Sequence, residues 1–390
     1  MNNVRRFTEV YRKEPHGIEF CPYRICPIGA HVDHNFGRIT GLAIDKGVHI
    51  AYGPKKNGVV ELSSIQFERR AQWHISQVDE RPTGDWADYL RGATWALTKR
   101  YDLKLGICGV IEGTLPIGGL SSSAAVIIAF LSALCKINNI QLTQREMITI
   151  AQEAERDYVG VSVGTLDQSC EVLCRKDNML YLDTLNGSYE LIPQNPAMKD
   201  YKIAIIFSGI ERTLAGSKYN MRVDEAKSAA YALMAYAGMD YGKFNEAVLR
   251  SVPVEVFNEY RHLLPKNWEK RAEHWYSENE RVQRGVEAWR RGDIVEYGRL
   301  SFESGRSSIE SWETGSDELR TLYEIMTHTD GIYGGRFSGA GFKGCCMALI
   351  DPVYAESIEE NMRREYLKVF PKLEGKYSFH LCESADGIKI

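Results

Sequence analysis

The sequence has no hydrophobic run long enough to cross a membrane and no apolar segment at its N-terminus. Its longest apolar run, from Val126 to Cys135, is about half of what a membrane-spanning helix needs. The first residues are polar and charged, unlike those of a secretory signal, and no low-complexity or proline-rich linker occurs. We therefore expect a folded protein of the cytoplasm that has no membrane partner.

Cysteine pairs of the zinc-binding kind and a continuous stretch of positive charge are also lacking. The nine cysteines include the adjacent Cys345 and Cys346 but no Cys-x-x-Cys pair, so reduced thiols in the core are the simplest interpretation. Cys170 and Cys174 have the spacing of one helical turn, yet no histidine or second cysteine pair completes a zinc site. The formal net charge of −4 arises from interspersed acidic and basic residues, which disfavours nucleic acid as a partner.

What the chain does contain is typical of a globular protein with two domains. Its 390 residues exceed the usual size of one hydrophobic core. Its composition, 44% hydrophobic and 26% charged, is close to the average. We place a boundary near residue 195, in the polar stretch from Asn186 to Lys199, which gives domains of residues 1–195 and 196–390. No internal repeat is present.

Hydrophobic periodicity predicts an α/β chain whose second half is mainly helical. A capping box, Thr143 to Glu146, begins a helix of about four turns whose apolar stripe runs to Tyr158. The stretch from Arg222 to Thr327 is predicted to be mostly helical. The other predicted elements are strands at 47–52, 59–63, 106–112, 201–207 and 346–350 and helices at 87–100 and 122–136.

A glycine- and serine-rich loop between a predicted strand and an apolar helix is the clearest local signal for a bound ligand. Glycines let backbone amides approach an anion, serine hydroxyls add donors, and the unpaired N–H groups of a helix N-terminus favour negative charge. The loop lacks the Gly-Lys-Ser ending of a Walker motif, and a glycine turn with a serine N-cap is an equal alternative. The candidate phosphate-binding residues are Pro116, Gly118, Gly119, Leu120, Ser121, Ser122, Ser123 and Ala124.

A second glycine-rich run extends from Gly334 to Gly344 and contains a literal Gly-x-Gly-x-x-Gly that begins at Gly339. In a dinucleotide-binding fold this motif follows a strand and opens a helix. Here it precedes the strand-like stretch from Cys346 to Ile350, which argues against a dinucleotide fold. A loop that packs closely against a ligand or against another loop fits better.

Together with a third segment, Pro22 to His34, these two loops resemble the three signature regions of the GHMP kinases. This superfamily contains galactokinase, homoserine kinase, mevalonate kinase and phosphomevalonate kinase. The third segment reads PYRICPIGAHVDH and is similar to the galactokinase signature GRVNLIGEHTDY. The resemblance spans nearly the whole chain, because further galactokinase segments are similar to residues 86–92, 154–155, 163–168 and 217–219.

The resemblance implies an α/β (α+β) chain with the two-domain GHMP kinase fold. The N-terminal domain would be of the ribosomal-protein-S5-domain-2-like type and the C-terminal domain ferredoxin-like, with the active site in the cleft between them and ATP against the phosphate loop. Asp167 matches the catalytic aspartate of the family and Arg24 the arginine beside it, while Ser123 and Glu155 match its magnesium ligands. The chemistry agrees, since a carboxylate accepts the proton of a sugar hydroxyl and positive charge stabilises the phosphates during transfer.

The resemblance also implies contacts with the sugar and the adenine. His31, Asp33, Gly164 and Tyr219 correspond to residues that bind sugar hydroxyls, and Trp86 would border the adenine. Without the resemblance these residues have plainer interpretations: a turn with a capping aspartate for His31 and Asp33, and a core aromatic for Trp86. Asp167 would then be an aspartate of a loop or helix cap, and Glu155 a solvated charge on a helix.

One departure from the galactokinase signature points to the substrate. Galactokinases carry a glutamate before the signature histidine, where it accepts a hydrogen bond from the hydroxyl at carbon six, and this chain has Ala30 there. A sugar carboxylate about 4 Å from a glutamate would be repelled by roughly 4 kcal/mol at an effective dielectric of about 20, and alanine removes that repulsion. Arg212 and Lys218, near Tyr219, could add positive charge. The signature and the run from Gly339 most resemble those of the galacturonokinases.

We therefore predict a transferase of carbohydrate metabolism, an ATP- and magnesium-dependent kinase that converts D-galacturonate to its α-1-phosphate. A galactokinase or a kinase of another acidic hexose is the alternative, and Ala30 argues against the ordinary galactokinase. A non-catalytic sensor of sugar and ATP is an alternative of another class, against which the retained Arg24 and Asp167 argue. His34 and Cys26 also replace the usual tyrosine and asparagine, and the phosphate loop is shorter by one residue. The oligomeric state is open, with a monomer favoured.

Overall fold

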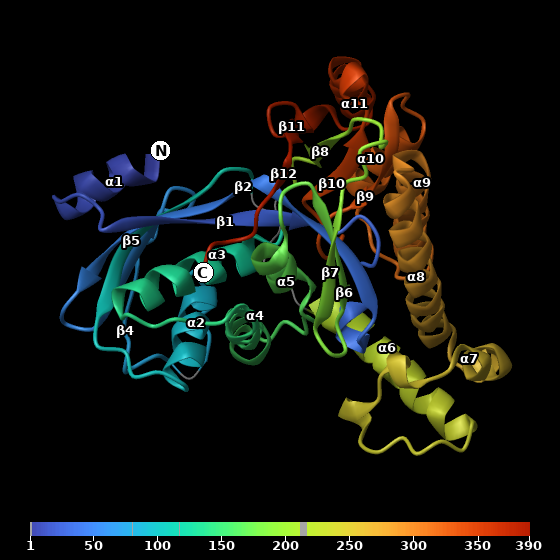
Figure 1. The fold of residues 1–390 in the computed structure, drawn as a ribbon, viewed down its shortest axis with the longest axis horizontal. Coiled ribbons are helices and arrows are strands. Elements are labelled where there is room, and N and C mark those ends of the chain that lie inside the picture. Colours follow the sequence, from blue (N-terminus) through green and yellow to red (C-terminus); the bar gives the residue numbers. More distant parts are fainter. Residues whose placement is uncertain (1, 80, 117, 211–216) are drawn as a thin grey trace.

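The computed structural model describes residues 2–79, 81–116, 118–210 and 217–390 (Figure 1). Its helices and strands are α1 (Asn2–Tyr11), β1 (Gly17–Ile25), β2 (Arg38–Lys55), β3 (Val59–Ser64), β4 (Ala71–His74), α2 (Asp88–Thr98), β5 (Gly106–Gly113), α3 (Ser122–Ile137), α4 (Gln144–Glu153), a π-helix (Ala154–Val159), α5 (Leu166–Leu173), β6 (Asn178–Asp183), β7 (Ser188–Pro193), β8 (Lys202–Phe207), α6 (Ser217–Tyr236), α7 (Val254–Tyr260), α8 (Lys266–Arg291), α9 (Ile294–Glu310), α10 (Asp317–Thr327), β9 (Ile332–Phe337), β10 (Cys345–Ile350), α11 (Ala355–Val369), β11 (Ser378–Cys382) and β12 (Ser384–Ala385). Short 3-10 turns join several of them.

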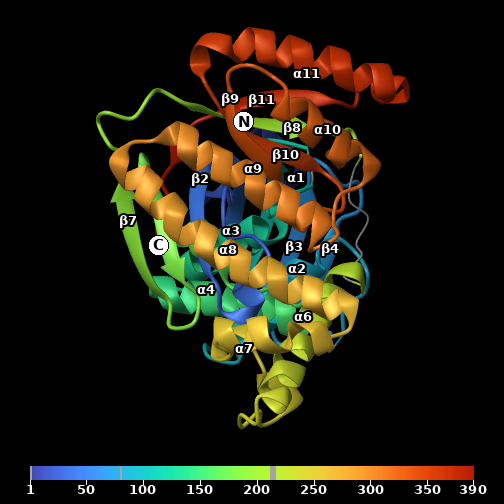
Figure 2. The same ribbon diagram turned by 90° about the vertical axis from the view of Figure 1, so that its right-hand side faces the viewer.

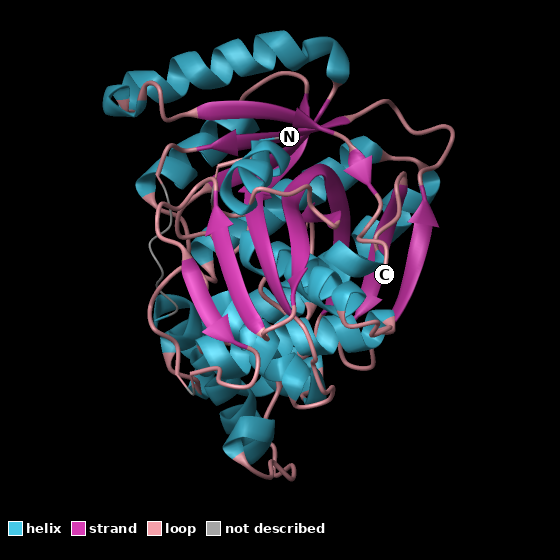
Figure 3. Ribbon diagram, turned by 90° about the vertical axis from the view of Figure 1, so that its left-hand side faces the viewer, coloured by secondary structure: helices cyan, strands magenta, loops and turns pink. Residues whose placement is uncertain are grey.

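An eight-stranded sheet organises the N-terminal half (Figure 3). Its order is β4-β3-β5-β2-β6-β7, and β1 and β12 also pair with β2. Side chains alternate between its faces: Ile107 and Ile111 of β5 belong to the main core beneath α2 and α3, whereas Cys108 and Val110 pack against Phe7 of α1. Helix α1 therefore lies on the opposite side of the sheet from α2 and α3 (Figure 1).

A four-stranded antiparallel sheet, in the order β11-β8-β10-β9, organises the C-terminal half. Every residue of β10 is buried, because Met347 and Leu349 face the main core and Ala348 and Ile350 face a second core formed with α10 and α11. Helices α8 and α9 lie side by side across the molecule, α9 against β9 and α8 against β2 (Figure 2). The long helix α8 thus connects the second half to the first sheet.

The two halves share one hydrophobic core. The main cluster contains residues of both, and Ser384 of β12 pairs with Ile44 of β2, so the chain returns to the first sheet near its C-terminus. Strand β7 ends at Pro193 and β8 begins at Lys202, on either side of residue 195. The division into residues 1–195 and 196–390 stays a prediction. Among the described helices, none has both the length and the apolar composition needed to span a membrane.

The predicted helices and strands are mostly confirmed, and the first sheet shows where local patterns were misleading. Strand β2 begins at Arg38, well before the predicted start at Gly47. Strand β1 is not predicted by periodicity, because it contains Pro22, which coincides with a register irregularity between Pro22 and Tyr23. The polar stretch after Asn186 contains β7, an edge strand with exposed residues.

Two further elements differ from the prediction. Residues 334–337, predicted as part of a glycine-rich loop, belong to β9 and pair with β10. Glycine suits this strand because the backbone of Gly298 in α9 lies so close that a Cβ built at Gly334 would come within 1.9 Å of its carbonyl oxygen. The helix that begins at the confirmed capping box of Thr143 and Glu146 changes into a π-helix at Ala154.

Candidate active site

A cavity of about 810 Å³ brings together most of the residues that the sequence indicates. Its wall is formed by β1 and the segment after it, the phosphate loop, the π-helix, the start of α5 and the turn between β9 and β10. Pro116 is exposed, Leu120 and Ala124 are buried in the fold, and none of the three lines the cavity. The predicted residues in the wall are Arg24, Ala30, His31, Asp33, Trp86, Gly118, Gly119, Ser121, Ser122, Ser123, Glu155, Gly164, Asp167 and Tyr219.

An ion pair forms part of the wall of this cavity. The Nε atom of Arg24, near the end of β1, donates to Oδ1 of Asp167, in the first turn of α5, at 2.7 Å. Burial, the largest single effect, would lower the pKa of Arg24, but the negative charge of Asp167, its hydrogen bond and the nearby cysteines together raise it. Nη1 of Arg24 also donates to the hydroxyl of Ser338 at 3.4 Å. The guanidinium is therefore charged and held in place, while the carboxylate stands in the cavity wall.

The phosphate loop and the second glycine-rich run pack against each other. A Cβ built at Gly339 would lie 2.9 Å from the carbonyl oxygen of Gly119, and one built at Gly344 would lie 2.7 Å from the carbonyl carbon of Gly118. The prediction that the second run packs against another loop is confirmed. Ser121, with φ of 56°, holds a left-handed conformation just before α3, and its buried hydroxyl has no hydrogen-bond partner among the described residues.

Ser123 and Glu155 meet at the edge of this loop. The hydroxyl of Ser123 donates to Oε1 of Glu155 at 2.7 Å, and Nε2 of Gln168 donates to Oε2 at 3.0 Å. Glu155 lies in the π-helix, a rare widening of the helical turn that often occurs at functional sites. A hydroxyl and a carboxylate suit a cation that prefers oxygen ligands. Within the described ranges no group of three or more His, Cys, Asp or Glu residues could hold a metal by itself.

Asp33 and Gly164 lie together in another part of the cavity wall, which we call the sugar end, and form one side of it. Oδ2 of Asp33 accepts a hydrogen bond from the backbone N–H of Leu166 at 3.1 Å. A Cβ built at Gly164 would lie 2.3 Å from the same oxygen, so only glycine fits there. Burial, followed by the negative charge of Asp167, raises the pKa of Asp33 to about 6.

Ala30, His31 and Tyr219 form the other side of this end. The imidazole of His31 stacks on Trp312 with ring centroids 5.4 Å apart and an interplanar angle of 7°, and the ring of Tyr219 lies 6.3 Å away. Nε2 of His31 is buried and has no hydrogen-bond partner in the described part of the chain. Burial is the main reason why the pKa of His31 lies far below its usual value, and the positive charge of Arg336 lowers it further. The imidazole is therefore neutral and sits in a positive potential.

Sequence reasoning missed several residues of this site. Trp312 belongs to no motif, and Ser338 lies in the second glycine-rich run but was not a candidate; only the folded chain brings them to the signature segment. Trp86 is half-buried at the edge of the main core, where its ring stacks on that of Phe67 at 5.7 Å, and both residues line the cavity. Lys218 is exposed and absent from the wall. Residue 212, the other proposed source of positive charge, lies outside the described residues.

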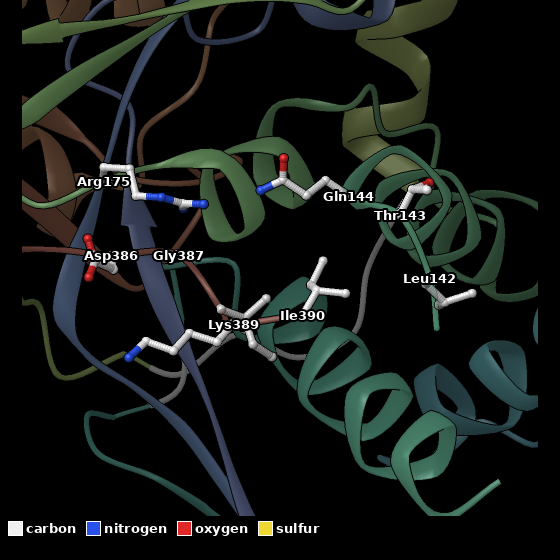
Figure 4. Close-up of a pocket in the computed structure, with 9 residues that line it drawn as sticks. Leu142, Thr143, Gln144, Arg175, Asp386, Gly387, Lys389 and Ile390 are labelled. Atoms are coloured by element: carbon white, nitrogen blue, oxygen red, sulfur yellow. The ribbon is translucent and has the colours of Figure 1, made fainter. Parts of the chain in front are cut away.

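A second cavity, of about 470 Å³, lies where α4 begins and the C-terminal residues end (Figure 4). Thr143, Gln144, Arg175 and Lys389 are in its wall, and none of the candidate residues is. Thr143 is engaged in the capping box of α4, and Arg175 donates to the carbonyl oxygen of Cys174 at 2.7 Å where α5 ends. Thr143 and Arg175 thus bind backbone groups at helix ends. The candidate residues that line a cavity lie in the larger one.

Comparison with known proteins agrees with this geometry. Residues 88–175 match the GHMP kinases N terminal domain, and residues 286–368 match the GHMP kinases C terminal family. The galacturonokinase of Arabidopsis thaliana is 36% identical, over 96% of this chain and 93% of that protein. A galactokinase of Roseiflexus sp. is 31% identical, over 98% of this chain and 95% of that protein.

Solved structures give the same result. The Lactococcus lactis galactokinase complexed with galactose superposes with a TM-score of 0.89 at 27% identity, covering 99% of this chain and 98% of that one. The Methanococcus jannaschii mevalonate kinase, at 16% identity and a TM-score of 0.63 over 95% of this chain and 98% of that one, shares the fold. The predicted fold is thus confirmed, and the chain belongs to the GHMP kinase family.

Proposed function

We propose that this protein is a sugar kinase that transfers the γ-phosphoryl group of ATP to the anomeric hydroxyl of D-galacturonate, giving α-D-galacturonate 1-phosphate. The observation that carries the proposal is Ala30 in the wall of the cavity, beside His31 and Asp33. Galactokinases have a glutamate at this position of their signature. Its replacement by alanine removes a negative charge where an acidic sugar would place its carboxylate.

The charges around His31 support an acidic sugar. After burial, the groups that lower the pKa of His31 are, in order, Arg336, His274, His34 and Arg24. Burial lowers the pKa of His34 to about 3 and that of His274 to about 4, so both are neutral at neutral pH. Arg336 and Arg24 are therefore the charges that make the potential at His31 positive, and the same potential favours a bound carboxylate. The 36% identity with the Arabidopsis thaliana galacturonokinase agrees with this interpretation.

In the proposed reaction the oxygen of the anomeric hydroxyl forms a bond to the γ-phosphorus of ATP. The bond from phosphorus to the β–γ bridging oxygen breaks, its electrons leave with ADP, and the hydroxyl proton passes to the carboxylate of Asp167. Arg24 holds that carboxylate at 2.7 Å and supplies fixed positive charge beside the transferring group. The N-terminus of α3 and the glycine backbone of the phosphate loop would receive the ATP phosphates.

Ser123 and Glu155 would hold a magnesium ion together with phosphate and water oxygens. Their oxygens are already 2.7 Å apart, and Gln168 orients the glutamate. A bound magnesium ion would neutralise phosphate charge. The described residues contain no group of three or more His, Cys, Asp or Glu that could hold a metal, so phosphate oxygens would complete the ligand set of an ion that arrives with ATP.

The test is an ATP-consumption assay with magnesium that compares D-galacturonate, D-glucuronate and D-galactose at equal concentrations. Preference for galacturonate would support the proposal. Preference for galactose would support the second candidate, a galactokinase, which is favoured by the TM-score of 0.89 with the galactose-bound Lactococcus lactis enzyme. Turnover of none of the three would contradict both and favour a sensor. A cytoplasmic location and a monomeric state remain predictions of the sequence.

A further inference from the structure

One side of helix α8 holds the backbone of the segment that carries Ala30, His31 and Asp33. The four side chains concerned are spaced i, i+1, i+4 and i+5, so they lie on neighbouring turns of a single helical face. Each binds a different backbone group of residues 29–38. The bonds are Glu278 Oε1 with the N–H of Gly29 (2.7 Å), His274 Nε2 with the carbonyl of Ala30 (3.0 Å), Trp275 Nε1 with the carbonyl of Val32 (3.3 Å) and Asn279 Oδ1 with the N–H of Arg38 (2.8 Å).

Glu278 is a charged anchor in a fully buried position. Burial would raise the pKa of its carboxyl, but the positive charges of Arg281 and Arg336 and the hydrogen bond from Ser304 are among the effects that together lower it. The carboxylate lies 3.5 Å from the guanidinium of Arg336 and also accepts a hydrogen bond from Ser304. Its acceptance of the Gly29 N–H is therefore a charge-assisted hydrogen bond, which is stronger than a neutral one.

Position 29, beside this anchor, accepts only glycine. Its φ is +102°, in the region that favours glycine, and a Cβ built there would lie 2.6 Å from the Cα of Ile39. The turn that presents Ala30 to the cavity is thus fixed on one side by Glu278 and on the other by strand β2.

His274 fixes the next peptide group, and its hydrogen-bond partners determine its tautomer. The carbonyl of Ala30 can only accept, so Nε2 of His274 carries the proton, and Nδ1 accepts from the hydroxyl of Ser307 at 2.8 Å. Burial lowers the pKa of His274 to about 4. The imidazole is therefore neutral at physiological pH and joins α9 to the carbonyl of Ala30.

We propose that His274 and Glu278 are positioning residues of the sugar site, which hold the Gly29–Ala30 peptide so that His31 and Asp33 face the sugar. Neither side chain lines the cavity. They act through the backbone of residues 29 and 30, and they belong to the second half of the chain, more than two hundred residues away. The phosphate loop has no such connection to α8 in the described hydrogen bonds, so the effect is confined to the sugar end. The proposal rests on the proposed function only in assuming that this end binds a sugar.

The test compares His274→Leu with His274→Gln. Leucine keeps the bulk but leaves the Ala30 carbonyl without its donor, whereas the amide of glutamine restores a donor. We expect the KM for the sugar to rise about tenfold or more in His274→Leu, because a displaced contact segment loses productive geometry, while the KM for ATP stays within about twofold. In His274→Gln, the KM for the sugar should lie at least half-way back to the wild-type value on a logarithmic scale.

Asn279→Ala is the matched control. It removes a backbone hydrogen bond from the same helix, but at Arg38, beyond the residues that face the sugar. We expect its melting temperature to fall by a similar amount as that of His274→Leu, with the KM for the sugar within about twofold of the wild type. An equal rise in the sugar KM of Asn279→Ala would mean that any loss of contact with α8 has this effect, and it would overturn the proposal.

Hydrogen exchange supplies a readout that needs no substrate. In His274→Leu, amides of residues 26–38 should exchange faster while those of residues 118–125 are unchanged. If His274→Leu does not fold, Ser307→Ala, which removes the partner of Nδ1, should show the same pattern with about a threefold rise in the sugar KM. Uniform exchange changes, or equal changes in the two KM values, would overturn the proposal. Kinetics use whichever of the three sugars the wild type prefers, so an error in the assigned sugar leaves this test intact.

Discussion

The two ends of the cavity are constructed differently. At the phosphate end, residues 118–123 form one continuous segment whose left-handed glycines and helix N-terminus are local properties. At the sugar end, His31 and Asp33 depend on Trp312 and on Gly164, and His274 of α8 holds the intervening backbone. The conformation of such a contiguous segment is set mainly by its own residues, with Gly339 and Gly344 as its close distant neighbours. An end assembled from distant elements can change its preferred sugar through single substitutions while the nucleotide end is retained.

The largest effect is expected at the junction of the two ends. Asp167→Asn removes the proposed proton acceptor and the partner of Arg24, so kcat should fall by about 10²- to 10⁴-fold. ATP affinity, measured by calorimetric titration, should change by less than about threefold, because the phosphate loop is untouched. Asp102→Asn is the control, since the Asp102 side chain is 80% exposed and, among the described residues, forms an ion pair with Lys104. Undiminished turnover in Asp167→Asn would remove this residue from the mechanism.

Ala30→Glu tests the sugar end alone. Because His274 holds the Ala30 carbonyl at 3.0 Å, the backbone cannot withdraw and the new carboxylate would face the sugar acid. We expect kcat/KM for galacturonate to fall by at least about tenfold, given a repulsion of several kcal/mol. Ala30→Gln separates charge from size and should lose much less. Equal losses in the two variants would show that bulk, not charge, determines the preference.

The pH dependence of kcat/KM should report Asp33. Its pKa is raised to about 6, so below this pH the carboxyl is protonated, loses its negative charge and part of its acceptor capacity, and binds the sugar hydroxyls more weakly. We expect kcat/KM for the sugar to fall by up to tenfold for each pH unit below a midpoint near 6, and Asp33→Asn to lack this limb. A pH-independent kcat/KM between 5 and 7 in the wild type would contradict this assignment.

Asp33 should also affect stability, with a sign set by the direction of its pKa shift. Because the folded pKa is raised from 3.8 to about 6, the contribution of Asp33 to stability is complete below about pH 3.8 and is lost as the pH rises through 6. The melting temperature of Asp33→Asn minus that of the wild type should therefore be larger at pH 7.5 than at pH 5. A difference that does not change with pH would contradict the shifted pKa.

The smallest effect is expected at the phosphate end. Gly344→Ala would place a methyl group 2.7 Å from the carbonyl carbon of Gly118, and the φ of Gly344, +103°, disfavours alanine. We expect the KM for ATP to rise about fivefold and the KM for the sugar to stay within about twofold, as a steady-state kinetic comparison would show. A larger rise for the sugar than for ATP would mean that the two ends are not separable in this way.

Motifs of contiguous residues allowed much of this protein to be predicted. The helix that follows the glycine- and serine-rich loop, the capping box of α4 and the strand after the second glycine-rich run are confirmed, since each depends on residues close in sequence. Strand β1, which carries Arg24, was not predicted because a proline such as Pro22 argues against a strand. From the sequence, residues 334–337 were predicted to lie in a loop, whereas they belong to β9. Glycine is needed at Gly334 because α9 packs closely against this strand, and a local sequence pattern does not show such a contact.

The sequence by itself determined the family, the phosphate loop and the identity of the residues around Ala30, because contiguous side chains and backbone conformations specify them. Only the tertiary structure decided that Arg24 meets Asp167, that Trp312 stacks on His31 and that His274 and Glu278 hold the Gly29–Ala30 peptide. These contacts join elements that are far apart along the chain. Their formation depends on the packing of α8 and the second sheet against the first, which no short stretch of sequence contains.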